Sequence, residues 1–343
     1  MRVFRSPASQ AHDPPLFFRR GKTIPHPERH ERVTVLETAL GNAGFALADP
    51  DDRGRGVIEA IHDPDYVRFL ESAWSRRAEL DPNATEILTT GFSKPQMNHK
   101  PTGLVGLLGY YMSDTSTSIV EGTWQAIYGA AQAAAAAADE ALAIGSAYAL
   151  CRPPGHHAFA DCAGGFCYFN NTAIAAQRLR MRGAERVAIL DIDVHHGNGT
   201  QGIFYPRADV LTVSIHGDPA NYFPFYAGYA EETGAGEGAG FNLNMPLVHG
   251  SGDATVLSAV DAALERIAAY KPSALVIALG LDASEHDPIG VLKVTTEGFA
   301  AIAARIARQP WPVTLIQEGG YLCDALPRNL IAFLTSFDRE RLR

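Results

Sequence analysis

From residue 147 onward, short apolar runs alternate with helical segments, and this alternation constrains the fold more than any other feature of the chain. The runs that we expect to be strands are 147–151, 187–194, 210–215, 274–280 and 313–317. Helices are expected at 171–182, 254–270 and 296–309. Strands that alternate with helices form mostly parallel sheets covered on both faces. We therefore predict an α/β fold in which residues 1–343 form one domain, with helices on both faces of a mostly parallel central sheet.

The N-terminal part has a weaker pattern. A strand is expected at 2–5, followed by a proline-rich loop, and helices at 29–43, 63–74 and 122–144. Residues 80–120 differ from the rest because they are rich in Gly, Ser, Thr, Asn and Pro and have little periodicity. Loops of this length are usually functional or interfacial.

The strongest chemical signal is the segment 191–197, Asp-Ile-Asp-Val-His-His-Gly, at the end of a predicted strand. Side chains alternate along a strand, so Asp191, Asp193 and His195 are expected on one face and His196 on the other. Two carboxylates on one buried face repel each other unless a cation lies between them. The pattern therefore predicts a metal site.

A further ligand is expected from Asp282, which directly follows the apolar run 274–280. With Asp193 and His195 it makes a three-ligand site, and a site with open positions is typical of catalytic metals. Oxygen-rich ligation also suits Fe²⁺, Co²⁺ or Mn²⁺.

Two turns supply candidate acid–base groups. Segment 152–157, Arg-Pro-Pro-Gly-His-His, follows one strand, and its Pro and Gly residues predict a rigid turn that holds His156 and His157 over the strand ends. Segment 318–321, Glu-Gly-Gly-Tyr, follows the last strand and presents Tyr321. Beside a metal, this phenol is expected to donate to a developing oxyanion.

Composition excludes some classes of function. The hydrophobic fraction is 46%, and no apolar run is long enough for a membrane helix. The net charge of −9 argues against a nucleic-acid partner, because duplex binding needs a basic face. The four cysteines have no zinc-site or disulfide pattern, and the N-terminus does not resemble a secretory signal, so we expect a cytoplasmic protein.

Together these motifs resemble the arginase–deacetylase superfamily and, within it, the histone deacetylase-like acetylpolyamine amidohydrolases. The segments that carry the resemblance are 152–157 (RPPGHH), 164–171 (GGFCYFNN), 190–201 (LDIDVHHGNGTQ), 213–216 (VSIH), 280–288 (GLDASEHDP) and 318–321 (EGGY).

The resemblance implies Zn²⁺ on Asp193, His195 and Asp282. It implies that His157 is the general base and then the general acid, and that Tyr321 binds the oxyanion. His156 would act electrostatically, oriented by Asp191. Asn198 would be the partner of His157, at a position where some histone deacetylases carry Asp.

The resemblance also implies a structural K⁺ near Asp191, Asp193, His195 and Ser214. Phe166 and Phe223 resemble the aromatic walls that hold an aliphatic stem. Some relatives bind the distal ammonium of a polyamine with a Glu where this chain has Ser116, and Asp114 is the nearest carboxylate.

The expected activity is zinc-dependent hydrolysis of the acetamide of acetylated polyamines or related small acetylated amines. In the relatives, the region that corresponds to 80–120 forms a dimer interface and narrows the active-site mouth, so a homodimer is expected. The alternative is a protein acetyl-lysine deacetylase, which a narrow mouth disfavours. A non-catalytic acetyl-ligand binder would require broken catalytic groups, and an arginase-like two-metal enzyme would require ligands that the sequence lacks.

Overall fold

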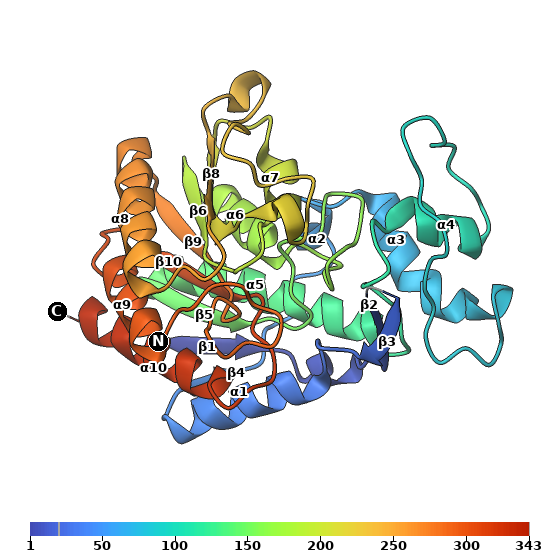
Figure 1. Ribbon diagram of the computed structural model, residues 1–343, viewed down its shortest axis with the longest axis horizontal. Coiled ribbons are helices and arrows are strands. Elements are labelled where there is room, and N and C mark those ends of the chain that lie inside the picture. The colour runs from blue at the N-terminus through green and yellow to red at the C-terminus, as the bar shows by residue number, and fades with distance from the viewer. Residues whose placement is uncertain (20, 343) are drawn as a thin grey trace.

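Eight strands form one central sheet in the computed structural model, which describes residues 1–19 and 21–342 (Figure 1). The strand order across the sheet is β4-β1-β5-β10-β9-β6-β7-β8. The strands are β1 (Arg2–Arg5), β4 (Ala46–Ala48), β5 (Ser146–Leu150), β6 (Val187–Asp191), β7 (Val210–Gly217), β8 (Asn242–Leu247), β9 (Ala274–Leu279) and β10 (Val313–Gln317).

Every neighbouring pair in this sheet is parallel, so all the carboxyl ends lie at one edge. The five strands β5, β6, β7, β9 and β10 are buried along their whole length. Strands that are covered on both faces have continuous apolar sequences rather than alternating ones. The predicted fold class is confirmed.

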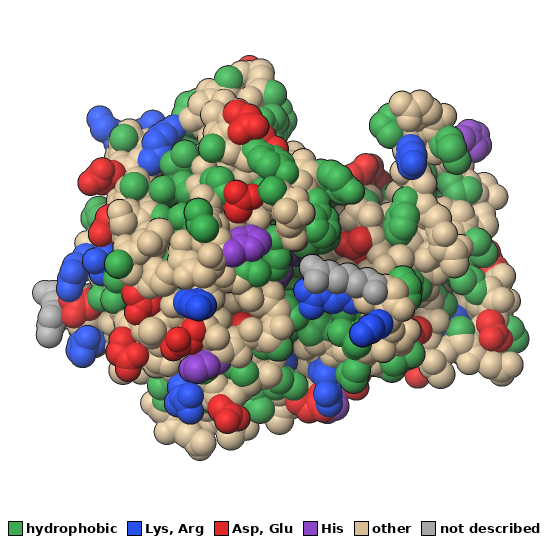
Figure 2. All heavy atoms as spheres, in the orientation of Figure 1, with side chains coloured by type: hydrophobic (Ala, Val, Ile, Leu, Met, Phe, Trp, Pro, Cys, Tyr) green, Lys and Arg blue, Asp and Glu red, His purple; other side chains and the backbone are tan. Residues whose placement is uncertain are grey.

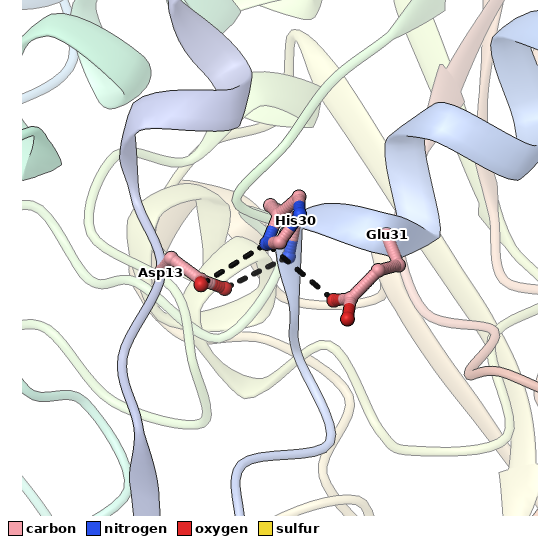
Figure 3. A group of neighbouring side chains, drawn as sticks. All are labelled: Asp13, His30 and Glu31. Atoms are coloured by element: carbon pink, nitrogen blue, oxygen red, sulfur yellow. Dashed lines mark hydrogen bonds and ion pairs between the residues drawn. The ribbon is translucent and has the colours of Figure 1, made fainter.

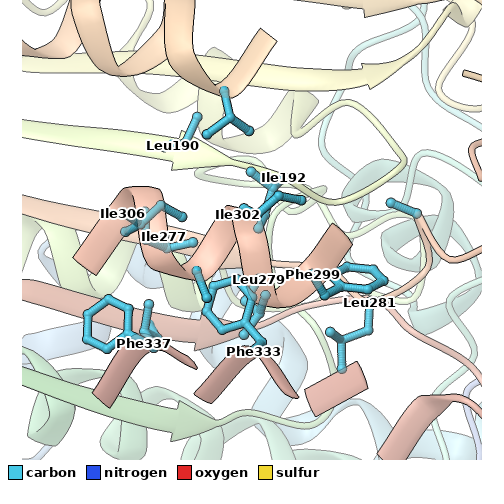
Figure 4. Packing of buried hydrophobic residues seen from close by; sticks show 14 of the residues in the cluster. Leu190, Ile192, Ile277, Leu279, Leu281, Phe299, Ile302, Ile306, Phe333 and Phe337 are labelled. Atoms are coloured by element: carbon cyan, nitrogen blue, oxygen red, sulfur yellow. The ribbon is translucent and has the colours of Figure 1, made fainter. Parts of the chain in front are cut away.

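One face of the sheet is covered by α1 (His30–Asn42), α8 (Asp253–Tyr270), α9 (Thr296–Ala307) and α10 (Leu326–Arg341). In Figure 4, Phe333 of α10 lies between Phe299 of α9 and Phe337, near Leu279 of β9, and Phe337 lies at the end of the row where Ile277 and Ile306 are. The amino group of Met1 lies 3.0 Å from Asp338 Oδ2, which ties the N-terminus to α10.

The opposite face is covered by α5 (Thr123–Ile144), α6 (Asn171–Met181) and α7 (Asn198–Phe204). The alanine run of α5, residues 133–138, is almost completely buried. Alanine side chains are small, so the α5 backbone can approach the sheet and α6 closely. This helix also carries the third hydrophobic cluster on its outer side.

That third cluster joins α5 to α2 (Gly56–Glu59), α3 (Pro64–Ala73) and α4 (Leu104–Tyr111), which project from one end of the sheet in Figure 1. A two-stranded hairpin of β2 (Leu16–Arg19) and β3 (Lys22–Pro25) lies on the same side. Short 3₁₀ helices occur at η1 (Pro7–Ala11), η2 (Trp74–Glu79), η3 (Pro219–Asn221) and η4 (Gly236–Gly238).

The structure differs from the sequence expectations in several places, and strands β4 and β8 and helix α10 were not predicted. The strand expected at 187–194 ends at Asp191. Ile192 N still donates to Ala278 O of β9, but Asp193 N and His195 N donate to aspartate side chains, which ends the regular ladder. The loop expected through Pro27 contains the β2–β3 hairpin, and region 80–120 contains α4. Region 80–120 was expected to be a loop because it is rich in Gly, Ser, Thr, Asn and Pro and has little periodicity.

In the part of the chain that is described, no helix is both long and apolar enough to cross a membrane. On the face drawn in Figure 2, acidic and basic side chains are interspersed.

Candidate metal centre

The polar groups of the site lie at the carboxyl ends of five adjacent strands, β5, β10, β9, β6 and β7. Ligands of open α/β sheets bind at this edge. The sequence motifs that carry these groups are far apart in the chain, and the parallel strands bring them together.

Asp193, His195 and Asp282 form a fully buried group in which each residue offers one ligand atom, all within 4.8 Å of one another. His195 Nδ1 lies 3.1 Å from Asp193 Oδ1 and 3.3 Å from Asp282 Oδ2. Asp282 Oδ2 is buried and accepts no hydrogen bond. An unsatisfied carboxylate oxygen aimed at such a group is costly unless a cation binds it. Two carboxylates and one imidazole fit a divalent metal with open positions.

Backbone amides hold these carboxylates in place. Asp191 Oδ1 accepts from Asp193 N at 3.0 Å, and Asp193 Oδ1 accepts from His195 N at 2.9 Å. Gly319 N donates to Asp193 Oδ2 at 2.8 Å. A Cβ atom at Gly319 would lie 2.0 Å from Asp282 Oδ2, so the close approach of this turn to the carboxylates requires glycine.

The charges of the group are strongly coupled. Burial disfavours protonation of His195, but Asp193 and Asp282 outweigh it and raise its pKa to about 9. Burial and the charge of Asp193 raise the pKa of Asp282. The carboxylates of the group thus favour binding of a proton or another cation, as expected for a cation site.

His156 and His157 lie side by side but differ in protonation. Burial opposes protonation of His156, but Asp193 and Asp191 outweigh it and raise its pKa to about 10. Its Nδ1 lies 2.9 Å from Asp191 Oδ2. Burial and the positive charges of His156 and His195 lower the pKa of His157 well below its usual range. At neutral pH, His156 is therefore the cation and His157 the free base.

His157 is oriented by a neutral partner. Its Nδ1 lies 2.7 Å from Asn198 Oδ1, so Nδ1 carries the proton and Nε2 is left as the basic nitrogen. His196 faces elsewhere, as expected, with Nε2 3.0 Å from Gln201 Oε1 and 3.2 Å from Asn244 Oδ1.

A buried ion network, which the sequence did not predict, supports the two turns that carry His156, His157 and Tyr321. Glu318 Oε2 accepts from Gly155 N at 2.6 Å and from His156 N at 3.0 Å. Arg32 donates to the backbone carbonyls of Glu318 and Gly320 and lies 5.3 Å from the Tyr321 ring centroid.

Glu28 completes this network. Its Oε1 lies 3.2 Å from Arg32 Nη1 and 2.9 Å from Arg152 Nε, and all three side chains are at most 1% exposed. The available sequence signal was the i,i+4 pairing of Glu28 and Arg32 at the start of a predicted helix. That pattern is also common on solvated helix surfaces.

The site opens through a cavity of about 300 Å³. His157, His195 and Tyr321 line its inner end, next to the Asp193–His195–Asp282 group, and Phe166 and Phe223 form its walls. The Phe223 ring lies 4.8 Å from that of His157, and the Phe166 ring lies 5.9 Å from that of Tyr321, between centroids. The two phenylalanines therefore border the entry to the metal group.

Asp114 also lines this cavity, but its carboxylate is already engaged. Oδ1 accepts from Ser116 N at 2.8 Å and from Ser116 Oγ at 2.6 Å, and Oδ2 accepts from Gly165 N at 2.7 Å. Gly165 and Phe166 have positive φ angles of 55° and 69°. Asp114 thus stabilises the loop that presents Phe166.

A small cavity of about 10 Å³ lies behind the metal group and is lined in part by Asp191 and Ser214. Ser214 Oγ lies 2.9 Å from His216 Nδ1. Asp191 and Ser214 are residues that the family resemblance implies for a potassium site, together with Asp193 and His195.

Asp13, His30 and Glu31 form a second group with ligand atoms close together, at the start of α1 (Figure 3). His30 Nδ1 lies 3.0 Å from Asp13 Oδ2 and 3.5 Å from Glu31 Oε2, and the three side chains are 37–47% exposed. Asp13 Oδ1 also accepts from His30 N at 3.1 Å. These contacts are those of a solvated ion-pair group that caps a helix.

The chain is similar to known deacetylases over nearly its whole length. The histone deacetylase domain model matches residues 26–337. An acetylpolyamine amidohydrolase of Burkholderia pseudomallei is 44% identical, with 99% of this chain and 100% of that protein covered. Acetylpolyamine amidohydrolase 1 of Pseudomonas aeruginosa is 46% identical over 93% of each chain. A crystal structure of acetylpolyamine aminohydrolase from Burkholderia pseudomallei superposes with a TM-score of 0.95 at 42% identity, covering 99% of both chains.

Because Glu28 belongs to the buried ion network, we expect loss of its charge to destabilise the protein more than loss of an exposed charge nearby. Glu28→Gln should destabilise the protein by about 3–5 kcal/mol, because it leaves the guanidinium groups of Arg32 and Arg152 buried without a counter-charge. Glu31→Gln is the matched control on the same helix end: its side chain is 37% exposed, and the loss should be below about 1 kcal/mol. Chemical denaturation measures both, and equal losses would contradict the role given to Glu28.

Proposed function

Because the chain belongs to the histone deacetylase domain family, we propose that it is a metal-dependent amidohydrolase that removes the acetyl group from acetylated polyamines and related small acetylated amines. The observation that carries the proposal is the convergence of a buried Asp193–His195–Asp282 group, a neutral histidine and a tyrosine on one cavity. The names of the relatives support acetylated polyamines as the substrate class.

We propose Zn²⁺ as the metal, with Fe²⁺, Co²⁺ and Mn²⁺ as alternatives that the same ligands would accept. Asp193, His195 and Asp282 would hold it. When bound, such a metal polarises an acetamide carbonyl and lowers the pKa of a water molecule. The unpartnered Oδ2 of Asp282 supports this assignment.

His157 is the proposed general base. Its lowered pKa keeps Nε2 free of a proton at neutral pH, so the imidazole can accept the proton of the attacking water. The same nitrogen then returns that proton to the leaving amine. His156, held protonated by Asp191 and Asp193, contributes a fixed positive charge beside the reacting group.

Tyr321 is the proposed oxyanion donor. Burial, although opposed by Arg32, raises the pKa of its phenol well above the usual value, so the hydroxyl keeps its proton and can donate it in a hydrogen bond. The backbone amide of Tyr321 donates to Asp287 Oδ2 at 2.8 Å, and Arg32 packs against the ring. These contacts fix the direction of the phenol before substrate binds.

Phe166 and Phe223 are the proposed walls for the aliphatic stem. Their rings border the cavity on either side of His157 and Tyr321 and exclude water from the amide. We also propose a structural K⁺ beside Asp191, Asp193, His195 and Ser214, supported by the small cavity that Asp191 and Ser214 line.

Region 80–120 is proposed to form a homodimer interface. Residues 114–116 of this region line the active-site cavity, whereas α4 and the preceding loop project away from the sheet. Met97 and Val105 in that projecting part are 72% and 55% exposed, which supports a covered surface in the assembly. Four cysteines without a disulfide suit the proposed cytoplasmic location.

The function is tested by assaying the zinc-loaded protein against acetylputrescine, acetylcadaverine, acetylspermidine and an acetyl-lysine peptide. Tyr321→Phe should lower kcat about 10²- to 10³-fold on every substrate that the wild type hydrolyses, because one oxyanion donor is lost. Equal rates for the two proteins would contradict the mechanism. Faster turnover of the peptide than of all the small amines would favour the protein deacetylase alternative.

The pH dependence of kcat/KM tests the pairing of His157 with Asn198. Asn198→Asp places a carboxylate on His157 Nδ1, which favours the imidazolium and raises the pKa of His157. Since the base is inactive when protonated, the acid limb of the profile should move to higher pH. Asn198→Ser, which adds no charge, is the control. An unmoved limb in the Asp variant would contradict the contact.

Light scattering tests the homodimer. We expect a dimer for the wild type and dissociation for Val105→Glu, because a buried unpaired carboxylate at an interface is unfavourable. A wild type that is monomeric at micromolar concentration would contradict the interface.

A further inference from the structure

One tyrosine lies flat against a proposed metal ligand. Tyr222 directly follows η3, in the segment after β7, and its ring stacks on that of His195, with 4.7 Å between the centroids and 11° between the ring planes. The rings of His157 and Phe223 meet His195 edge-on, at 5.8 Å and 6.4 Å. Among the described side chains, Tyr222 is therefore the one that lies parallel to this imidazole.

The imidazole of His195 needs a neighbour that fixes its orientation. A metal ligand must aim the lone pair of Nδ1 at the ion, whereas χ2 of histidine is a broad torsion. In most metal sites a hydrogen bond to the second ring nitrogen fixes the ring. In the described part of the chain, no group hydrogen-bonds to Nε2 of His195, while Nδ1 faces Asp193 and Asp282. A ring stacked on one face can prevent rotation by steric contact instead.

The hydroxyl of Tyr222 connects this ring to a second loop. It donates to the backbone carbonyl of Ile289 at 2.8 Å. Asp287 holds the same loop, because its Oδ1 accepts from Ile289 N at 2.9 Å and its Oδ2 accepts from Tyr321 N at 2.8 Å. The hydroxyl of Tyr222 is thus linked, through this loop, to the turn that carries Tyr321.

We propose that Tyr222 is a positioning residue for two parts of the site. Its ring orients His195 towards the metal, and its hydroxyl holds the loop through which Asp287 places Tyr321. This inference rests on the proposed function, because that function assigns His195 as a metal ligand and Tyr321 as the oxyanion donor. Tyr222 itself neither binds the metal nor moves a proton. Since its ring and its hydroxyl act on different residues, two substitutions separate their effects.

The role of the ring is tested by zinc binding, which requires no substrate. Tyr222→Leu removes the stacked face and should raise the Kd for Zn²⁺ about 10- to 100-fold, the usual effect of losing a group that orients a metal ligand. Tyr222→Phe keeps the face and should bind Zn²⁺ as tightly as the wild type. Competition with a chromogenic chelator measures both. In Co²⁺-loaded protein, Tyr222→Leu should also shift the visible ligand-field bands, and Tyr222→Phe should not.

The role of the hydroxyl is tested by turnover of the zinc-loaded protein on its best acetylated amine. Tyr222→Phe should lower kcat about 2- to 10-fold, as expected for the loss of one neutral hydrogen bond, with little change in KM. Because this loss acts through Tyr321, Tyr222→Phe should have no further effect on kcat in the Tyr321→Phe background. A general loss of structure would lower kcat equally in both backgrounds.

Tyr270 provides the matched control. It is 3% exposed, against 8% for Tyr222, and its hydroxyl donates to the backbone carbonyl of Ala208 at the same distance of 2.8 Å. Tyr270 ends α8 just before β9 begins, and Ala208 lies just before β7, so this contact is at the sheet edge opposite the site. Tyr270→Leu and Tyr270→Phe should destabilise the protein without changing its zinc affinity or its kcat.

Wild-type zinc affinity in Tyr222→Leu, or an equal weakening in Tyr270→Leu, would overturn the role of the ring. No loss of kcat in Tyr222→Phe, or an equal loss in both Tyr321 backgrounds, would overturn the role of the hydroxyl. Tyr222→Met, which fills similar space without an aromatic face, replaces Tyr222→Leu if that variant does not fold. A wild type that binds no zinc and hydrolyses no acetylated amine would instead count against the proposed function.

Discussion

The architecture of the site depends on one electrostatic constraint. Two buried carboxylates, Asp193 and Asp282, lie within 4.8 Å of one imidazole at the carboxyl edge of neighbouring strands. Such a group is stable only with positive charge among its members. Backbone amides from Val194, His195 and Gly319 orient the carboxylates but leave Oδ2 of Asp282 free. The cation site is thus prepared by hydrogen bonds that do not occupy it.

The same charges give two adjacent histidines different protonation states. Asp191 and Asp193 keep His156 protonated, and that positive charge, with burial, keeps His157 neutral. One carboxylate cluster therefore sets both a fixed charge and a free base. A shell of fully buried ions, centred on Glu28, holds the turns that carry His156 and Tyr321.

Much of this arrangement could be predicted from the sequence. The parallel sheet followed from alternating strands and helices, and the convergence of Asp193, His195 and Asp282 followed from their places after two strands. The ion network of Glu28, Arg32 and Arg152 could not be found in this way, because its members pair across separate elements and charged residues in sequence usually indicate solvated surfaces. The cavity-facing position of Arg19 was also hidden. It depends on a hairpin within a segment whose prolines indicated a loop.

The β2–β3 hairpin and residues 114–116 also show why substrate selectivity is harder to predict from sequence than the type of reaction. The proposed metal ligands and the proposed acid–base groups follow strands of a rigid sheet, whereas the mouth is built by segments with weak periodicity. Side chains of these segments, such as Arg19 and Asp114, line the mouth of the cavity. The chemistry is therefore set by the fold and the selectivity by its peripheral segments.

The most direct test of the central claim is the thermal unfolding of chelator-treated protein with and without added Zn²⁺. We expect chelation to lower the Tm and one equivalent of Zn²⁺ per chain to restore it. The bound metal should stabilise the folded protein by about 4 kcal/mol when the free metal concentration is a thousand times Kd. The same addition should not stabilise Asp282→Ala. A wild-type Tm that chelation and zinc leave unchanged, with no stoichiometric metal in the purified protein, would contradict the account.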